Sequence, residues 1–245
     1  MIGDIYTVAW KELVEFRDSL LRIKRGGLSG LVVILMLGIV TPLQMGPLWL
    51  ESPLMLAYWP LLSSGMVSTL IADAFAGERE RHTLETLLAS RLSDTSILLG
   101  KIFAAILYGL LFTFANILVG VITLNVRHFG DAIQAPPALH IGYMLVLVIL
   151  ANAALAGVGI FVSLRAPTVR QAQQTLGIIM MVLFIGPFLF IRLIDSADRL
   201  TMAAKVASLG TAKLVAWASG VLLVTSIVLI LMAMARFKRG KLVLD

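Results

Sequence analysis

Residues 95–124 read TSILLGKIFAAILYGLLFTFANILVGVITL and contain a single charged side chain, that of Lys101. An α-helix rises about 1.5 Å per residue, so about 20 apolar residues cross a hydrocarbon core about 30 Å thick. The stretch is longer than this minimum, which predicts a helix that tilts or extends past the bilayer. It therefore predicts a membrane-spanning helix, and it sets the class of the whole chain.

Further apolar runs lie on both sides of this stretch. Of the 245 residues, 59% are hydrophobic and 14% are charged, whereas soluble domains are about a quarter charged. We therefore expect an all-α membrane protein with a single transmembrane domain, residues 1–245. Its parts are an amphipathic helix at 1–27, a six-span bundle at 28–235 and a basic cytoplasmic tail at 236–245. The predicted spans are 28–47, 53–75, 95–124, 138–164, 172–194 and 213–235.

The charge and composition exclude several other classes of protein. The formal charge is +6, but the basic residues flank apolar runs, which indicates membrane topology and contact with anionic lipid rather than nucleic acid. The chain has no cysteine, which excludes disulfides and thiolate chemistry. The histidines show no metal-ligand spacing, so no metal site is expected.

The distribution of Lys and Arg predicts the orientation. Six spans place both termini on one side, and the positive-inside rule makes that side the cytoplasm. The cytoplasmic side then holds Lys11, Arg17, Arg22, Lys24, Arg25, Arg79, Arg81, Arg91, Lys101, Arg165, Arg170, Arg236, Lys238, Arg239 and Lys241. The other side holds Arg127, Arg192, Arg199, Lys205 and Lys213. We therefore expect a multi-pass protein of the cell (plasma or inner) membrane.

The segment before the first span is patterned as an amphipathic helix. Its apolar residues recur at steps of three and four with charged residues between them; they are Ile5, Val8, Ala9, Leu13, Phe16 and Leu20. Such a helix lies in the membrane interface, with Trp10 at the level of the headgroups. The alternative is a solvated helix packed on another cytoplasmic chain.

A dense charged block separates the second and third spans. Residues 74–101 read AFAGERERHTLETLLASRLSDTSILLGK. Read as a helix, residues 78–89 place three leucines on one side and bring Glu78 near His82, and Arg81 near Glu85. Ser93 and Asp94 are typical of a cap before the next span. Because so short a helix is marginal alone, we expect a partner to hold it.

This block resembles the cytoplasmic signature of permease subunits of type-2 ATP-binding-cassette (ABC) exporters. The matching motifs are Gly77-Glu78-Arg79-Glu80, Thr83-Leu84-Glu85, Leu87-Leu88, Ser93 and Gly100-Lys101. The resemblance implies that the block docks on a separate ATPase, which holds ATP and Mg. It also implies two ATPase copies and a second permease copy, either in a homodimer or in a pair with a similar permease. The chain itself lacks the G-x-x-x-x-G-K-[ST] loop of ATPases, so we expect no enzyme and no catalytic residue here.

The resemblance also assigns the residues that couple the chain to the ATPase. They are Glu78, Arg79, Glu80, Arg81, Thr83, Leu84, Glu85, Leu87 and Leu88. We expect the three leucines to enter a groove of the ATPase and the charged residues to fix the register. Two positions differ from the family: His82 stands where Gly is usual, and Arg91 where Pro is frequent. We expect His82 to keep the helix running.

Polar residues within the spans leave two roles open. Asn116 and Asn152 are candidates for a substrate path or for hydrogen bonds between helices. The small residues at 151–159, ANAALAGVG, indicate a close helix contact, either within the bundle or between two copies. The alternatives to an exporter permease are the membrane component of a haem exporter for cytochrome maturation, and a non-transporting scaffold or intramembrane enzyme. The apolar spans mildly favour a hydrophobic or amphipathic cargo.

Overall fold

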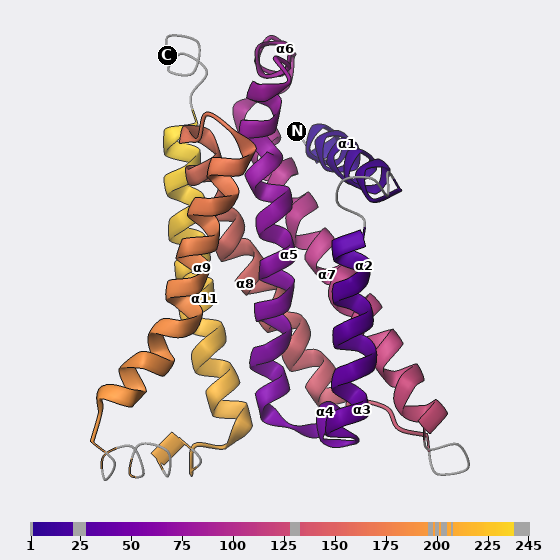
Figure 1. Cartoon of the computed structure of the whole chain (residues 1–245). Helices are drawn as coiled ribbons and strands as arrows, with labels where there is room; N and C mark the ends of the chain where they lie inside the picture. The colour runs from indigo at the N-terminus through magenta and orange to yellow at the C-terminus, as the bar shows by residue number, and fades with distance from the viewer. Residues whose placement is uncertain are drawn as a thin grey trace.

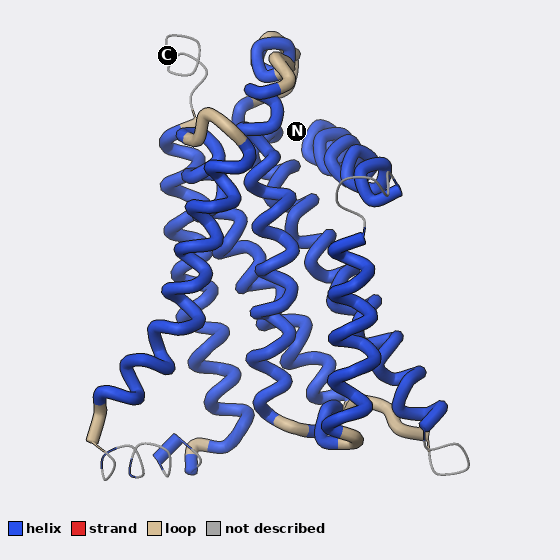
Figure 2. The backbone as a smooth tube through the Cα atoms, in the orientation of Figure 1, coloured by secondary structure: helices blue, strands red, loops and turns tan. Residues whose placement is uncertain are grey.

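A computed structural model describes residues 2–21, 28–127, 133–195 and 208–237, together with positions 198, 201, 205 and 206. Over these residues the fold is helical and has no strand (Figure 2). The predicted basic tail from 238 onward, and positions 196, 197, 199, 200, 202–204 and 207 of the predicted outer segment, lie outside the described residues.

The long helices form a bundle, and α1 lies across one end of it (Figure 1). The short helix α6 lies at the same end, beyond the end of α5. The end of α11 also lies there, while α3 and α4 lie at the opposite end. The helices are α1 (Ile2–Leu21), α2 (Leu28–Leu35), η2 (Met36–Val40), α3 (Thr41–Met45), α4 (Leu48–Glu51), α5 (Pro53–Glu80), α6 (Leu84–Leu88), α7 (Asp94–Arg127), α8 (Ala138–Arg165), α9 (Val169–Leu193) and α11 (Gly210–Arg236).

Among the described residues, 4 helices are long and apolar enough to cross a membrane: α5, α7, α8 and α11. The first apolar run is shorter, with an apolar helical part at Val32–Met45. The predicted fifth span corresponds to α9, which carries Arg170 and Gln171 in its first turn and Arg192 in its last. The all-helical membrane fold is thus confirmed, and the membrane-spanning character is supported for these helices rather than for all six predicted spans.

The central helix of the bundle is α8, which packs on α5, α7, α9 and α11. Its small residues permit this. A Cβ on Gly159 would lie 2.2 Å from Cγ2 of Ile71 on α5, and one on Gly157 would lie 2.8 Å from Cβ of Leu229 on α11. The small-residue face at 151–159 is therefore a contact within the bundle, which decides between the two alternatives that the sequence left open.

The first apolar run contains a π-helical turn, η2, between α2 and α3. Gly38 in this turn packs directly beneath Val119 of α7, whose Cγ1 would lie 2.8 Å from an added Cβ. Two threonine hydroxyls bond carbonyls of the turn: Thr123 donates to Gly38 O at 3.2 Å, and Thr41 donates to Leu37 O. A π-turn weakens the regular backbone ladder, and these hydroxyls supply hydrogen bonds in its place.

The end of the bundle opposite α1 is held by aromatic packing. Trp49 is 1% exposed, and its ring lies edge-to-face on Trp59 with centroids 5.2 Å apart. The ring of Trp49 covers Gly120, where an added Cβ would lie 2.1 Å from Cη2. Leu56, Leu124 and other apolar residues complete this cluster. Shape complementarity around two large rings therefore fixes this end.

Candidate functional site

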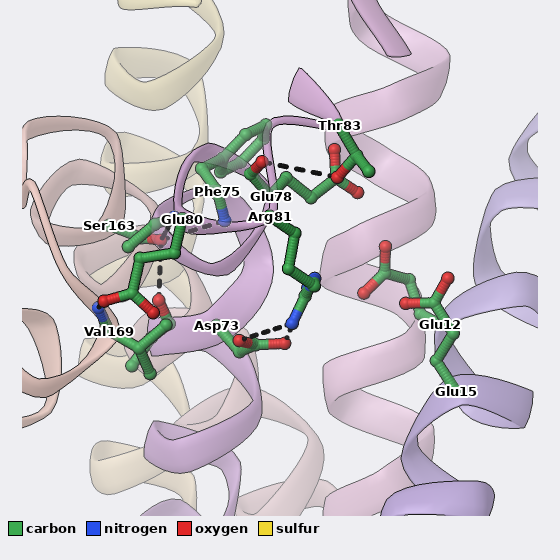
Figure 3. Close-up of polar contacts among 12 residues, drawn as sticks. Glu12, Glu15, Asp73, Phe75, Glu78, Glu80, Arg81, Thr83, Ser163 and Val169 are labelled. Atoms are coloured by element: carbon green, nitrogen blue, oxygen red, sulfur yellow. Dashed lines mark hydrogen bonds and ion pairs between the residues drawn. The ribbon is translucent and has the colours of Figure 1, made fainter. Parts of the chain in front are cut away.

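The last turn of α5 and the residue after it carry the charged run Glu78-Arg79-Glu80-Arg81. Successive residues of a helix point about 100° apart, so the four side chains leave α5 in different directions. Figure 3 shows this divergence, with Glu80 directed toward Val169 and Arg81 toward Asp73. Each side chain therefore contacts a different part of the fold.

Glu78 lies at a buried junction of α1, α5 and α7. Its Oε1 accepts hydrogen bonds from Nζ of Lys101 at 3.1 Å and from Nζ of Lys11 at 3.2 Å. Lys101 also donates to Oε1 of Glu12 on α1, at 2.5 Å. Lys101 is 1% exposed and Glu78 2%, so both charges are removed from water and depend on each other for solvation.

The pKa of Lys11 reports the charge balance of this junction. Burial by itself lowers the pKa of Lys11, but the negative charges of Glu78, Glu15 and Glu12 raise it, and the pKa ends above its usual value. Lys11 therefore stays protonated and adds a second cation beside Glu78.

Arg79 and Glu80 connect α5 to the junction of α8 and α9. Arg79 donates to the carbonyl of Ala166 at 2.5 Å and to that of Leu164 at 2.8 Å, at the end of α8. Glu80 accepts from the backbone N–H of Val169, the first residue of α9, at 3.1 Å. A cation at a helix C-terminus and an anion at a helix N-terminus both complement the helix dipole. The two contacts are therefore electrostatically matched to the helix ends that they bind.

Arg81 turns back along α5 to Asp73. Its Nη1 and Nη2 donate to the two oxygens of Asp73 at 3.2 and 3.1 Å, which is a two-pronged contact. Burial lowers the pKa of Arg81, and the hydrogen bond and negative charge of Asp73 raise it above its usual value. Gly77 lies under this pair, since an added Cβ would sit 1.9 Å from Oδ1 of Asp73. Asp73 thus holds Arg81, the residue after α5, against the last turns of that helix.

The prediction that His82 continues the helix is wrong. α5 ends at Glu80, and His82 adopts a left-handed backbone conformation with φ of 56°. The N–H of His82 bonds Arg79 O at 3.1 Å, and the N–H of Thr83 bonds Glu78 O at 2.9 Å, which is the Schellman arrangement of a helix end. His82 has the backbone shape that Gly adopts most easily, and the helix breaks for that reason.

The two helix pairs predicted from spacing are also wrong. The pair of Glu78 with His82 does not form, because Glu78 binds Lys101 and Lys11. The pair of Arg81 with Glu85 does not form, because Arg81 binds Asp73 and the helix breaks before Glu85. Spacing of four residues brings side chains together only within one continuous helix.

Beyond the break lies the tip, residues 81–91, built around α6. Leu84 is 8% exposed, and it packs with half-buried Leu87 on the core of this same chain. The side chain of Leu88 lies outside the described residues. The exposed members are Arg81, His82, Thr83, Glu85, Thr86, Ala89 and Arg91. The exposed side chains that the structure describes in the tip are therefore mainly polar, and Leu84 and Leu87 attach it to the bundle.

The cap predicted before the third span is confirmed. The hydroxyl oxygen of Ser93 accepts from the N–H of Ser96 at 3.1 Å, and α7 begins at Asp94. The acidic side chain of Asp94 lies in the first turn, where it suits the helix dipole. Five residues, 89–93, separate the end of α6 from the start of α7, so the break at His82 is followed by the short helix α6 and a turn rather than by one longer helix.

The family model described as ABC-2 type transporter matches residues 13–192. The match begins within α1, includes the charged run and the tip, and ends within α9. The chain belongs to the ABC-2 type transporter family. It is therefore the membrane permease component of a transporter, and no ATPase loop occurs in its sequence. No curated protein shows a significant sequence match to it.

In this ABC-2 chain, Asn116 and Asn152 are both buried between helices. Nδ2 of Asn152 on α8 donates to Oγ of Ser63 on α5 at 2.6 Å, beneath Gly109 of α7. Nδ2 of Asn116 donates to the carbonyl of Phe112 one turn earlier in α7, at 3.0 Å. Neither side chain is exposed in this conformation. Asn152 joins α8 to α5, as expected of a hydrogen bond between helices, whereas the bond of Asn116 stays within α7.

Sequence reasoning missed two residues that join elements of the ABC-2 fold. Ser163 on α8 accepts from the N–H groups of Phe75 and Ala76 and donates to Ala72 O, each within 3.0 Å. Lys101 was interpreted as a topology charge, although it is the buried cation of the Glu78 junction. A signal for Lys101 existed, because a lone charge inside an apolar span needs a partner.

Proposed function

We propose that the chain couples ATP hydrolysis by a separate ATPase to the export of a substrate across the membrane. The observation that carries this proposal is the connection between the exposed tip and the charged run. The tip lies beyond the end of the bundle, while residues 78–80 reach α1, α7, α8 and α9 (Figures 1 and 3). A force applied at the tip would therefore reach most of the helices.

The exposed face of the tip suits a protein partner that selects by charge. It carries both signs, namely Arg81, Glu85 and Arg91, and along the chain between them lie His82, Thr83 and Thr86, which are also exposed. Polar contacts of this kind set register and orientation between proteins. The burial of Leu84 changes the roles expected from sequence: Leu84 and Leu87 hold α6 to the permease, and the polar residues meet the ATPase.

Motion of the tip would pass to the other helices through direct hydrogen bonds from the end of α5. The Arg79 fork binds two carbonyls at the end of α8, and Glu80 binds the first N–H of α9. Ser163 ties α8 to the backbone of α5 one turn before the charged run. The end of α5 and the α8–α9 junction would consequently move together when the tip moves.

The proposed assembly contains two permease copies and two ATPases in the cell membrane. The orientation with both termini in the cytoplasm is supported by α1, α6 and the end of α11, which lie at one end of the bundle (Figure 1). The basic residues Lys11, Arg79 and Arg165 also lie close to that end, since Lys11 binds Glu78, and Arg79 binds the end of α8 that carries Arg165; the positive-inside rule expects such a grouping. Exposed apolar residues of α9 and α11 suit lipid or a second copy.

The experiment compares Thr86→Arg on the tip with Ala135→Arg in the loop before α8. Both residues are exposed and both variants gain the same charge, but they lie at opposite ends of the bundle. The complex is purified through a tag on this chain, and bound ATPase and ATP turnover are measured. We expect Thr86→Arg to lose the bound ATPase and Ala135→Arg to retain it. Equal retention by both variants would remove the tip as the docking surface.

A further inference from the structure

The inner face of α1 is seated closely on the start of α7. Val8 and Ala9 are buried, and Gly100 of α7 lies directly beneath Val8. A Cβ on Gly100 would lie 2.6 Å from Cβ of Val8 and 3.0 Å from the carbonyl oxygen of Ile5. The two backbones therefore approach as closely as a glycine permits, and one residue later α7 presents Lys101.

Lys101 is the cation that joins this contact to the end of α5. Its ammonium group binds Glu12 of α1 at 2.5 Å and Glu78 of α5 at 3.1 Å, and it lies 5.2 Å from the ring centre of Phe75. A buried ion pair is weak support for stability, because desolvation offsets much of the attraction. Its directional contacts instead specify one relative placement of the three helices.

A second face of α1, next to the buried one, is apolar and exposed. Ile2, Tyr6 and Trp10 are 84%, 63% and 59% exposed, and their spacing of four residues places them on one side of the helix. Tyr6 and Trp10 stack with their rings 6.3 Å apart. Aromatic side chains of this kind occupy the membrane interface. α1 thus has one face locked to the bundle by charge and another suited to the lipid surface.

We propose that Lys101 is a positioning residue that holds α1 to the C-terminal end of α5, next to the tip. In this proposal α1, the end of α5 and the start of α7 move as one body. The proposal rests on the proposed function only for the source of the motion, which is the ATPase at the tip. It follows that α1 moves together with the tip when the ATPase acts, and that α1 carries this motion to the lipid surface.

The competing explanation is that apolar seating of Val8 on Gly100 holds α1, and that the charges are incidental. Glu12→Gln tests whether the contact with Lys101 is needed to hold α1. It removes the carboxylate on α1 while Lys101 and Lys11 keep their contacts with Glu78. Glu15→Gln is the matched control, because Glu15 is one turn away on the same helix and pairs with Lys11 at an exposed position. Glu12→Asp keeps the negative charge.

The first arm uses the full chain alone in lipid nanodiscs. Because the chain has no cysteine, spin labels at Thr7→Cys on α1 and Thr95→Cys on α7 give one specific distance. We expect a single narrow distance for the parent, for Glu15→Gln and for Glu12→Asp, and loss of that narrow peak for Glu12→Gln. A narrow peak in Glu12→Gln would overturn the proposal, because α1 would then be held without its contact to Lys101, by apolar seating or by the pair of Lys11 with Glu78.

The second arm uses the unlabelled complex purified with its bound ATPase. We expect Glu12→Gln to retain the ATPase but to lose permease-dependent ATP turnover by about fivefold or more, the lower range of coupling between sites. Unchanged turnover would overturn the role of Lys101 in coupling. Failure of an ATPase to bind even the parent chain would instead remove the proposed function, and the first arm would still decide whether Lys101 positions α1.

Discussion

The two ends of the bundle are held by different kinds of contact. At the end that carries α1 and α6, charged side chains on α5 bind three other parts of the fold through directional hydrogen bonds. At the opposite end, Trp49 lies on Gly120 and against Trp59, and its indole N–H has no hydrogen-bond partner among the described residues. The difference teaches that directional charged contacts specify the arrangement of helices at one end, and complementary shape specifies it at the other.

The largest expected effect comes from removing the buried cation. Lys101→Met leaves Glu12 and Glu78 buried without it, although Lys11 still reaches Glu78. We expect the free energy of unfolding to fall by about 3 kcal/mol, the lower range for breaking a buried pair. Denaturant unfolding in detergent measures it. Lys213→Met, at an exposed lysine of α11, is the control and should change it by less than about 0.5 kcal/mol. An equal loss in both variants would contradict the special role of the charged end.

The corresponding test at the aromatic end is Gly120→Ala. The added Cβ would lie 2.1 Å from Cη2 of Trp49, and Trp59 blocks easy movement of that ring. We expect overpacking to lower the free energy of unfolding by about 1–3 kcal/mol. Gly142→Ala, where a Cβ meets nothing within 4 Å, is the matched control and should cause no loss. Unfolding curves of the two variants, together with tryptophan emission, check this; a stable Gly120→Ala would show that the aromatic cluster is loosely packed.

A smaller effect, of opposite sign, is expected at the helix break. His82→Gly relieves the left-handed conformation of His82, and the gain is partly offset by the greater freedom of Gly in the unfolded chain. The free energy of unfolding should rise by about 0.5–1 kcal/mol. His82→Ala should bring no such gain, because Ala disfavours the same conformation. Thermal unfolding of the three proteins ranks their stability. A higher melting temperature for His82→Ala than for His82→Gly would contradict the left-handed conformation at this position.

The smallest effect concerns pH. The pKa of Lys11 is raised above its usual value of 10.5, so its contribution to stability is fully present below that value. The contribution is lost only as the pH rises through the raised pKa of the folded protein. Unfolding measured from neutral pH up to the usual lysine value should therefore show no change due to Lys11. A difference between the parent and Lys11→Met that varies within this range would contradict the placement of Lys11 among Glu78, Glu12 and Glu15.

Local signals in the sequence predicted much of the fold. Long apolar runs gave the helices α5, α7, α8 and α11, and the spacing of Val8, Ala9 and Leu13 gave the inner face of α1. The serine at 93 gave the start of α7, because capping is decided by neighbours in the chain. These predictions succeeded because the responsible interactions span only a few residues.

The contacts of the site were harder to predict because they join distant residues. Nothing in the sequence pairs Glu12 with Lys101, or Glu80 with the N–H of Val169. The break at His82 was missed because the usual signal, a glycine, is absent and the backbone adopts the strained conformation regardless. Tertiary contacts around Glu78 and Arg79 outweigh the local preference of histidine.

The π-turn η2 can also be understood as an inserted residue. An α-helix turns about 100° per residue, and a hydrogen bond that spans five residues instead of four accommodates one extra residue in the turn. The helix after Met36–Val40 therefore faces about 100° away from where a regular helix would place it. A chain shortened by one residue within this turn would regain a regular helix. However, α3 would then rotate about its axis, and α4 with Trp49 would be displaced along with it. The insertion in the first apolar helix thus sets where the aromatic end of the bundle can close.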